Sequence, residues 1–471
     1  MSDPRDQRIA DLEAENAADK ARIADLERKV EELTHLVMTL KGQMNRSSSN
    51  SNKPPSGDSP DQRAERRGKG TGGKRGGQPG HSGSMRALVP PEQVSELKKL
   101  FPSECENCWA PLPSAPVSSV QRFQTVELPQ LEAYVTEWQR HCIKCPRCSH
   151  ETWASVAPIP TTPFGPRLSA AIGLFTGVYH LSRRAAVNLL SDVLGIEISL
   201  GAVSAVEERV SEAVKPAVAE AWAKVEHAPV KHTDGTSWFQ AGAMCSLWTI
   251  ATSIVTVFKI LANGQAATLS PLFGAKLGIL VSDRATALKF WAMERRQICW
   301  AHLLRKAISF SERDGPAGAL GRELLDYIGI VFDYWNQLRA GEVSREKFRE
   351  LMAPVRLHVE ALLERGRAAK LPLVSGSCED ILEHRLALWT FVDQEGVEPT
   401  NNHAEQELRA FVLWRKRSFG TQSERGNLFA ERLMTVAHTA RKQNRNVLEF
   451  LSACCAAARS GATPPSLFAA A

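Results

Sequence analysis

Three acidic residues of this chain could together hold metal ions. Asp234 and Asp283 each follow a short apolar run, in KHTDGTSW and GILVSDRATA, and Glu405 lies in TNNHAEQELR. Carboxylate oxygen is the ligand that Mg²⁺ prefers in proteins. Two such cations can stabilise both the attacking and the leaving oxygen when a phosphodiester is cleaved. We therefore predict that Asp234, Asp283 and Glu405 converge and bind two Mg²⁺ or Mn²⁺ ions.

Each of these acids also has an ordinary structural explanation. An Asp after a strand often forms a turn or caps a helix, and Asp283 before RATAL suits an N-cap. Glu405 alone is a first-turn acid that the helix dipole stabilises, and Glu407 is a second acid nearby. Spacing alone leaves both explanations open for all three acids.

The segments before and between the two Asp residues show strand patterns. APVKHTDG predicts a short strand ending at Asp234, and CSLWTIATS with IVTVFKILA predicts an antiparallel meander. KLGILVSD predicts a buried strand closed by Asp283, ATALKFWAMERR a helix, and RQICWAH another short strand. Ligand sites of such α/β sheets lie at the carboxyl ends of the strands, which is where we expect both Asp residues.

The segment before Glu405 is helical in pattern. Residues 302–385 lack strand runs and read as a helical insertion into the sheet domain. Asn401 or Asn402 can then cap the helix that carries Glu405 in its first turn. Residues 401–445 contain nine Lys and Arg against four acids. We expect Arg415, Lys416 and Arg417 to neutralise and position phosphates near the acids, and Arg409, one turn after Glu405, to have a supporting role at the site.

Bulk composition sets the class of the protein. The chain has 471 residues, too many for one core, so three or four units are expected. Hydrophobic residues make up 43% and charged residues 23%, both ordinary for a globular protein. We find no run of 18 apolar residues and no signal peptide, and we expect a cytoplasmic protein. Ten cysteines then point to metal binding or buried thiols rather than disulfides.

The N-terminus shows a heptad pattern over residues 9–44. The a positions are Ile9, Asn16, Ile23, Val30, Val37 and Met44, and the d positions are Leu12, Asp19, Leu26, Leu33 and Leu40. β-Branched residues at a with Leu at d favour a parallel two-stranded coiled coil, and a buried Asn fixes its register. We predict self-association through this segment, although a lone surface helix would show a similar pattern and Asp19 weakens its first half.

A basic, low-complexity segment follows. Residues 41–90 carry ten Lys and Arg against three acids, in stretches such as RRGKGTGGKRGGQPGHSG. Such a composition cannot bury enough apolar surface to fold. We predict a flexible tether whose cations bind nucleic acid, and the alternative is a solvated spacer.

Paired cysteines follow the linker. Cys105 and Cys108 form one CxxC pair, and Cys145 and Cys148 form another. Four thiolates can hold a tetrahedral Zn²⁺ with no open position, so we predict a structural zinc ribbon. VQRFQTVELP and AYVTEWQRHC alternate as strands would. Cys142 is a further thiol, either a spare ligand or a bystander.

Residues 167–225 are helical in pattern throughout. LSRRAAVNLLSDVLG predicts a helix that ends at Gly195, and Ser199 can cap the next one, LGAVSAVEERVSEAV. Two helices joined by a short turn suit a helix-turn-helix, although many helix bundles contain such a corner. In this hypothesis Arg183 and Arg184 face phosphates and the start of the second helix faces bases.

These segments, in this order, resemble transposases of the insertion-sequence 66 family. The resemblance rests on SNSNKPPSGD, GGQPGHSG, the coiled-coil start, the two CxxC pairs, CWAHLLRK and TNNHAEQELR followed by RKRSFGTQSERG. It implies an RNase H-like core whose Asp-Asp-Glu residues fall on Asp234, Asp283 and Glu405. His302 in CWAH falls on a histidine typical of the family, for which a supporting role is implied. This chain departs from the usual family pattern at Gly235, after the first Asp, and at Gln406 and Glu407, after the Glu.

The resemblance therefore implies a multidomain α+β transposase. Such an enzyme cleaves DNA at the terminal inverted repeats of its element and joins the 3′-hydroxyl to target DNA, sometimes with accessory proteins of the same element. The alternatives are a non-catalytic dimeric DNA-binding protein and a structure-specific nuclease. The expected units are a coiled coil (1–44), a basic linker (45–90), a zinc ribbon (91–160), a helix-turn-helix (161–225), the catalytic core (226–425, with insertion 302–385) and a helical tail (426–471).

Overall fold

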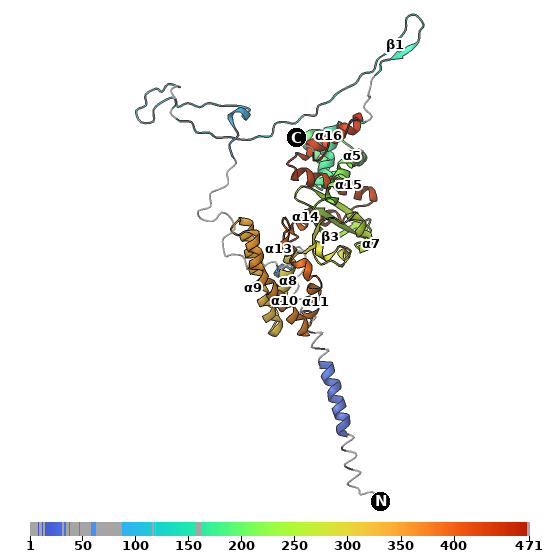
Figure 1. Ribbon diagram of the computed structural model, residues 1–471. Coiled ribbons are helices and arrows are strands. Elements are labelled where there is room, and N and C mark those ends of the chain that lie inside the picture. Colours follow the sequence, from blue (N-terminus) through green and yellow to red (C-terminus); the bar gives the residue numbers. More distant parts are fainter. Residues whose placement is uncertain are drawn as a thin grey trace.

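The computed structural model in Figure 1 describes the chain with gaps. The described residues are 8, 12, 15–30, 33, 37, 47, 58–62, 87–114, 117, 119–155 and 162–468. Most of the expected linker, and the coiled-coil positions Ile9, Leu40 and Met44, lie outside these residues.

The N-terminal helix covers residues 15–30. Asp25 pairs with Arg28 at 2.6 Å and with Lys29 at 2.7 Å. Such pairs one turn apart stabilise a helix by about 0.2–0.5 kcal/mol each. Ile23 and Leu26, at a and d positions of the heptad, are 54% and 53% exposed. The apolar heptad positions of this helix therefore face solvent in a single chain.

The two cysteine pairs lie in an extended arm, residues 87–155, that leaves the folded body in Figure 1. Its regular elements are η2 (Pro91–Gln93) and the antiparallel strands β1 (Cys142–Lys144) and β2 (Glu151–Trp153). The strands predicted over residues 120–141 are wrong, because that backbone runs without a sheet partner. Phe123 and Tyr134 in it are 88% and 96% exposed, so alternation alone did not produce a sheet.

A helical layer follows the arm. It consists of α3 (Pro166–Gly173), the π-turn η3 (Leu174–Val178), α4 (Arg183–Leu194), α5 (Leu200–Ala213) and α6 (Lys215–Glu226). The predicted boundaries are confirmed: α4 ends at Gly195, whose φ is 62°, and Ser199 Oγ accepts the N–H of Ala202 at 3.1 Å. Val206 and Val210 of α5 are fully buried, so this helix is packed into the body.

The central sheet has five strands in the order β5-β4-β3-β6-β7. The strands are β3 (Val230–Gln240), β4 (Ala243–Ala251), β5 (Thr256–Leu261), β6 (Ile279–Ser282) and β7 (Arg296–Ile298). The predicted meander is confirmed, since β3, β4 and β5 pair antiparallel, while β6 pairs parallel with β3 and β7 parallel with β6. The short α7 (Ala266–Leu269) and η4 (Ser270–Phe273) connect β5 to β6.

Two predictions around the Asp residues are wrong. β3 does not end at Asp234 but continues through it to Gln240, because β4 pairs with it along that whole length. ATALKFWAMERR forms no α-helix but two short turns, η5 (Thr286–Leu288) and η6 (Met293–Arg295). Trp291 turns into the core between them and donates Nε1–H to the carbonyl of Arg295 at 2.9 Å, which interrupts the helix.

The predicted helical insertion lies between β7 and the helix of Glu405. It contains α8 (Trp300–Ser311), α9 (Gly315–Ala340), α10 (Arg345–Ala368), α11 (Ser375–Glu383), α12 (Arg385–Leu388) and α13 (Thr390–Asp393). These helices share a hydrophobic core that includes Trp300, Phe348 and Phe391. In Figure 1, α9, α10 and α11 lie on the far side of the sheet from α5, α15 and α16.

Three helices complete the fold: α14 (Asn402–Ser418), α15 (Glu424–Lys442) and α16 (Val447–Ser460). The boundary expected at residue 425 falls inside α15. That helix covers the edge of the sheet, because Thr435 and Thr439 accept the N–H groups of Phe258 and Thr256 of β5, both at 3.2 Å. The outer edge of the sheet is thereby closed to other strands. Among the described helices, none is long and apolar enough to cross a membrane.

Candidate active site

Asp234 and Asp283 lie side by side on neighbouring parallel strands. In the register between β3 and β6, His232 stands opposite Val281. Carried two residues further, the same register places Asp234 opposite Asp283, which directly follows β6. Adjacent strands are about 4.8 Å apart, so the two carboxyl groups share one end of this pair of strands.

The backbone holds both carboxylates in place. Asp234 Oδ1 accepts the N–H of Gly235 at 2.8 Å, and Asp283 Oδ1 accepts the N–H of Ala285 at 2.9 Å. The second bond is the turn-forming contact that an Asp after a strand ordinarily makes. Arg296, fully buried on β7, donates to the carbonyl of Asp283 at 3.1 Å and fixes the chain there. Asp283 therefore has a structural contact and still lies beside Asp234.

Helix α14 covers the face of β3 that carries Asp234. Alternate residues of a strand share a face, so His232, Asp234 and Trp238 project to the same side. His232 stacks on His403 with ring centroids 5.2 Å apart, and Trp238 meets Phe411 edge to face at 5.4 Å. Both partners belong to α14, and these contacts set the helix against the strand.

The first turn of α14 is tied to β3 by Asn401. This residue occupies the N-cap position, as predicted, but its side chain caps nothing. Instead Asn401 Nδ2 donates to the carbonyl of Thr233 at 2.8 Å, one residue before Asp234. The side chain of Asn401 is completely buried, so this bond fixes Glu405 relative to Asp234.

Two residues of α8 contact Glu405. Arg305 Nη2 lies 3.5 Å from Glu405 Oε2, and His302 Nδ1 lies 3.8 Å from Glu405 Oε1. Arg305 also contacts His302 Nε2 at 3.3 Å. Burial lowers the pKa of His302, and the nearby Glu405 carboxylate works against that shift. The sequence singled out His302 but missed Arg305, three residues further along the same CWAHLLRK segment.

The charges of the three acids act on one another. Burial, then the carboxylate of Asp283, and more weakly that of Glu405, raise the pKa of Asp234 to about 7. Arg305 opposes this shift. A carboxyl group whose pKa is raised towards 7 by burial and by two neighbouring acids is typical of a catalytic or metal-binding site.

The glycine after Asp234, a departure from the family pattern, has a structural cause. A Cβ atom at Gly235 would lie 2.8 Å from Cε2 of Trp248 on β4, closer than side chains pack. Trp248 is buried and cannot move away freely. The absence of a side chain at Gly235 therefore leaves room for the indole ring of Trp248 beside β3, and the strand continues past this position.

Glu407 points away from the site. It pairs with Lys442 of α15 at 2.9 Å, with His438 at shorter distance and with His403 at 3.7 Å. Burial opposes the negative charge, but the hydrogen bond from His438 and the charges of His438 and Lys442 prevail and lower the pKa of Glu407 to about 2. This second acid of α14 therefore anchors the helix to α15.

The predicted cationic residues near Glu405 have different environments. Arg415 donates to Ser237 Oγ at 2.6 Å and to Thr236 Oγ1 at 3.1 Å, so it is attached to β3. Lys416, Arg417 and Arg409 are exposed. Their charged groups therefore face solvent on α14.

The predicted cations of α4 also differ from each other. Arg183 pairs with Glu207 of α5 at 2.6 Å, whereas Arg184 is exposed. A groove of about 710 Å³ adjoins Arg183 and Glu207 and extends to Trp414 and Arg425. Its walls therefore include the start of α4, α5, the end of α14 and the start of α15.

The two cysteine pairs share one local structure. Cys105 N donates to Ala110 O at 2.9 Å and Trp109 N to Cys105 O at 2.8 Å, and residues 145–150 repeat both bonds at 2.8 Å. Backbone N–H groups of Asn107 and Cys108 lower the pKa of the Cys105 thiol, and those of Cys148 and Arg147 lower that of Cys145. Each pair therefore lies in the same kind of hydrogen-bonded turn. Among the described residues, the structure does not bring the two halves within ligand distance.

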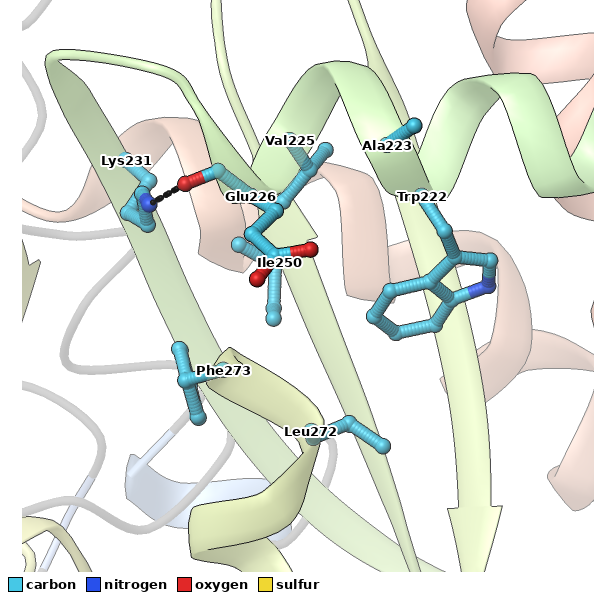
Figure 2. Close-up of a pocket in the computed structure, with 8 residues that line it drawn as sticks. All are labelled: Trp222, Ala223, Val225, Glu226, Lys231, Ile250, Leu272 and Phe273. Atoms are coloured by element: carbon cyan, nitrogen blue, oxygen red, sulfur yellow. Dashed lines mark hydrogen bonds between the residues drawn. The ribbon is translucent and has the colours of Figure 1, made fainter. Parts of the chain in front are cut away.

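A separate cavity lies on the other face of β3. Figure 2 shows its walls, which include Trp222, Ile250 and Phe273, with Lys231 donating to the carbonyl of Glu226 at 2.9 Å. Its volume is about 210 Å³. Burial lowers the pKa of Lys231 to about 8. Because residues 231 and 234 alternate in direction along the strand, this cavity is not part of the carboxylate site.

Comparison with protein families identifies the class of the protein. Residues 162–428 match the family described as Transposase IS66 family, a stretch that includes Asp234, Asp283 and Glu405. The match covers more than half of the chain and identifies a transposase. The protein belongs to the IS66 transposase family, which confirms the resemblance seen in the sequence. Residues 1–87 match a family of unknown function, DUF6444. A comparison with curated proteins found no match.

Proposed function

We propose that the protein cleaves the ends of its insertion sequence and joins them to target DNA, with Asp234, Asp283 and Glu405 as the active site. The observation that carries this proposal is that Asp234 on β3 and Asp283, directly after the neighbouring parallel strand β6, lie close enough for their charges to interact, and that Glu405 also acts on Asp234. Three acids gathered in one largely buried place repel one another unless cations join them. Their repulsion supports a role in binding divalent metal.

The donor set fits Mg²⁺ or Mn²⁺. All three groups offer carboxylate oxygen, and Glu405 Oε1 is buried with no hydrogen-bond partner among the described residues. When bound, two such ions would supply charge stabilisation to the attacking and leaving oxygens of a phosphodiester. Hydrolysis would release a 3′-hydroxyl at the element's end, and that hydroxyl would displace a phosphodiester oxygen of the target strand.

The remaining residues of the site position its acids. Asn401 fixes the start of α14 to β3, and His302 and Arg305 orient Glu405 from α8. Arg415 stays attached to β3, while Lys416, Arg417 and Arg409 remain free to meet the phosphates of a bound strand. The order of the strands, with an antiparallel meander beside two parallel strands, supports an RNase H-like core.

Recognition of the terminal inverted repeats would use the parts before the core. The two similar cysteine turns support a structural Zn²⁺ held by Cys105, Cys108, Cys145 and Cys148, which would require the arm to fold back on itself. The pair α4 and α5 supports a helix-turn-helix in which Arg184 meets phosphate while Arg183 holds the two helices together. Accessory proteins of the same element would act with this DNA complex.

Self-association through residues 1–44 would bring two element ends together. Ile23 and Leu26, at a and d positions, are half exposed in a single chain, as expected for apolar residues that pack against a second helix. Leu26→Lys should reduce the molar mass measured by light scattering to that of one chain. Ala24→Lys, exposed and off the apolar stripe, should leave it unchanged. An unchanged mass for Leu26→Lys would refute this segment as the dimer contact.

The experiment that tests the function measures Mg²⁺- or Mn²⁺-dependent cleavage and joining of DNA carrying the element's ends. Asp234→Ala, Asp283→Ala and Glu405→Ala should each abolish both steps, whereas Glu424→Gln, an exposed first-turn acid of α15, should not. Activity that survives all three substitutions would overturn the site. Binding without activity in the unmodified protein would indicate a non-catalytic DNA-binding protein, and cutting without joining or end preference would indicate a nuclease.

A further inference from the structure

A second set of potential ligands shares Glu405. Cys299 is the N-cap residue of α8, His302 lies in the first turn of that helix, and Glu405 lies in the first turn of α14. One ligand atom from each lies within 4.8 Å of the other two. This trio is distinct from the Asp-Asp-Glu set, because it contains a thiol and an imidazole.

Two of these ligand atoms are buried and make no hydrogen bond to the described residues. His302 Nδ1 and Glu405 Oε1 face each other at 3.8 Å, and neither has a hydrogen-bond partner among the described residues. Arg305 contacts the other oxygen, Oε2, and the other ring nitrogen, Nε2, so it leaves this pair of atoms available. Leaving a buried polar atom unpaired is unfavourable, and a ligand between the two atoms would satisfy both of them.

The thiol of Cys299 is buried between the starts of α8 and α14. Its side chain is fully buried, and Sγ accepts the N–H of Asn401 at 3.1 Å. Burial raises the pKa of the Cys299 thiol to about 11, and the N–H groups of Asn401, His302 and Ala301 oppose that rise. N–H donors around a sulfur stabilise the thiolate form that binds metal. The N–H donors around the sulfur are therefore in place, and a bound cation would supply the rest of the charge stabilisation that the thiolate needs.

We propose that Cys299, His302 and Glu405 bind a single Zn²⁺-class cation. Thiolate, imidazole and carboxylate together suit zinc, whereas Mg²⁺ selects oxygen ligands. With zinc–ligand bonds of about 2.0–2.3 Å, tetrahedral ligand atoms lie roughly 3.3–3.8 Å apart, so the trio needs to close by only about 1 Å at its widest pair. Three protein ligands leave the fourth position to water.

Zinc at this site would inhibit the transposase. Glu405 belongs to both sets of ligands, and a cation held by Cys299 and His302 would withdraw it from Asp234 and Asp283. This consequence rests on the proposed function, but the binding itself does not. The trio would make strand cleavage sensitive to the ratio of zinc to magnesium.

Binding is tested on the full-length protein with Cys105→Ser and Cys148→Ser, which remove one thiol from each half of the zinc site proposed for the arm. Co²⁺ serves as the probe, because a thiolate ligand gives it a charge-transfer absorption. One equivalent of Co²⁺ with this absorption is expected. Adding Cys299→Ser or His302→Gln should remove the absorption, whereas Cys378→Ser, another fully buried thiol, should retain it.

An unchanged absorption in both site variants, or no bound Co²⁺ in the parent, would refute the site. Two variants are used because Cys299→Ser places a hydroxyl in a buried position, while His302 lies nearer the surface. Circular dichroism identifies a variant that fails to fold. Asp234→Ala should still bind Co²⁺, which separates this site from the Asp-Asp-Glu set.

Inhibition is tested by adding Zn²⁺ to Mg²⁺-dependent cleavage of end DNA. The zinc concentration that halves the rate should rise at least tenfold in Cys299→Ser, each protein being compared with its own zinc-free rate. Equal sensitivity of the two proteins would refute the regulatory role. If zinc binds as expected but no variant cleaves DNA, the proposed function fails and the zinc site stands.

Discussion

Asn401 donates its side-chain amide to the carbonyl of Thr233 at 2.8 Å, and this bond joins the helix of Glu405 to the strand of Asp234. The two residues are far apart in the sequence. Thr233 immediately precedes Asp234, and Asn401 closely precedes Glu405. Both are completely buried. This amide group therefore adds to the ring contacts that fix the relative position of the two carboxylates.

Replacing that amide should damage both stability and activity. Asn401→Ala leaves the carbonyl of Thr233 buried and unpaired, so we expect a loss of about 1–3 kcal/mol in the free energy of unfolding. Urea unfolding followed by tryptophan fluorescence measures it. Asn402→Ala, at the exposed neighbouring position, is the matched control and should change little. A loss of cleavage with unchanged stability would show that Asn401 acts in some way other than by tying α14 to β3.

The ionised side chain of Asp234 should destabilise the metal-free protein near neutral pH. A free Asp titrates at 3.8, and Asp234 titrates at about 7 in the fold. Since the folded pKa is the higher one, ionisation opposes folding, and the penalty grows from pH 3.8 until the pH has passed 7. Asp234→Asn should therefore raise the free energy of unfolding above pH 7, by on the order of 1–3 kcal/mol, and change it little at pH 4.

Thermal unfolding with a chelator, measured across pH, checks this expectation. Added Mg²⁺ should stabilise the unmodified protein and have little effect on Asp234→Asn. Asp326→Asn, on the exposed face of α9, controls for a general effect of removing negative charge. An Asp234→Asn protein that is less stable at pH 8 would contradict the raised pKa.

The glycine after Asp234 should resist substitution. Gly235→Ala places a methyl group 2.8 Å from Cε2 of Trp248, and overpacking of this kind costs about 1–3 kcal/mol. Trp248→Leu in the same chain should recover part of the loss, because it removes the atoms that clash. Gly329→Ala in α9 meets nothing within 4 Å and should stabilise the helix by up to about 1 kcal/mol. If Gly235→Ala were neutral in unfolding measurements, the contact with Trp248 would not be what selects glycine.

The exposed cations at the end of α14 should contribute to DNA affinity through charge. Lys416→Ala and Arg417→Ala should each weaken binding uniformly across sequences and reduce the slope of log affinity against log salt by about 1. Arg415→Ala should lower cleavage more than affinity, since Arg415 is bonded to Ser237 and Thr236 of β3. Fluorescence anisotropy at several salt concentrations measures the slopes. Lys347→Ala on α10 should match the unmodified protein; equal slopes for all four variants would exclude α14 from the interface.

Local patterns in the sequence predicted the fold where neighbouring segments also pair in space. The meander β3-β4-β5 is made of consecutive strands, and the boundary at Gly195 and the cap at Ser199 depend on short-range contacts. The path of β3 through Gly235 was missed because glycine after Asp reads as a turn. Only Trp248, brought alongside by β4, explains why the strand continues.

The residues of the site could be predicted from the sequence, but their arrangement in space could not. Asp234, Asp283, Glu405 and His302 could be named from their segments and from the family resemblance. Asn401, Arg305 and Cys299 stand in the same segments, yet their contacts join residues about a hundred or more positions apart. The arm shows the opposite case, since its two cysteine turns form locally and the contact between them is long-range.

The two ends of the helical insertion meet at one point. Trp300 N donates to Pro399 O at 2.8 Å, where the chain leaves for α8 and where it returns to α14. A segment whose ends touch can be lengthened, shortened or exchanged without moving its host. The helices beyond the first turns of α8 therefore leave and rejoin the sheet domain at one point, and they stay attached to it through a core that includes Val281 of β6 and Ile298 of β7.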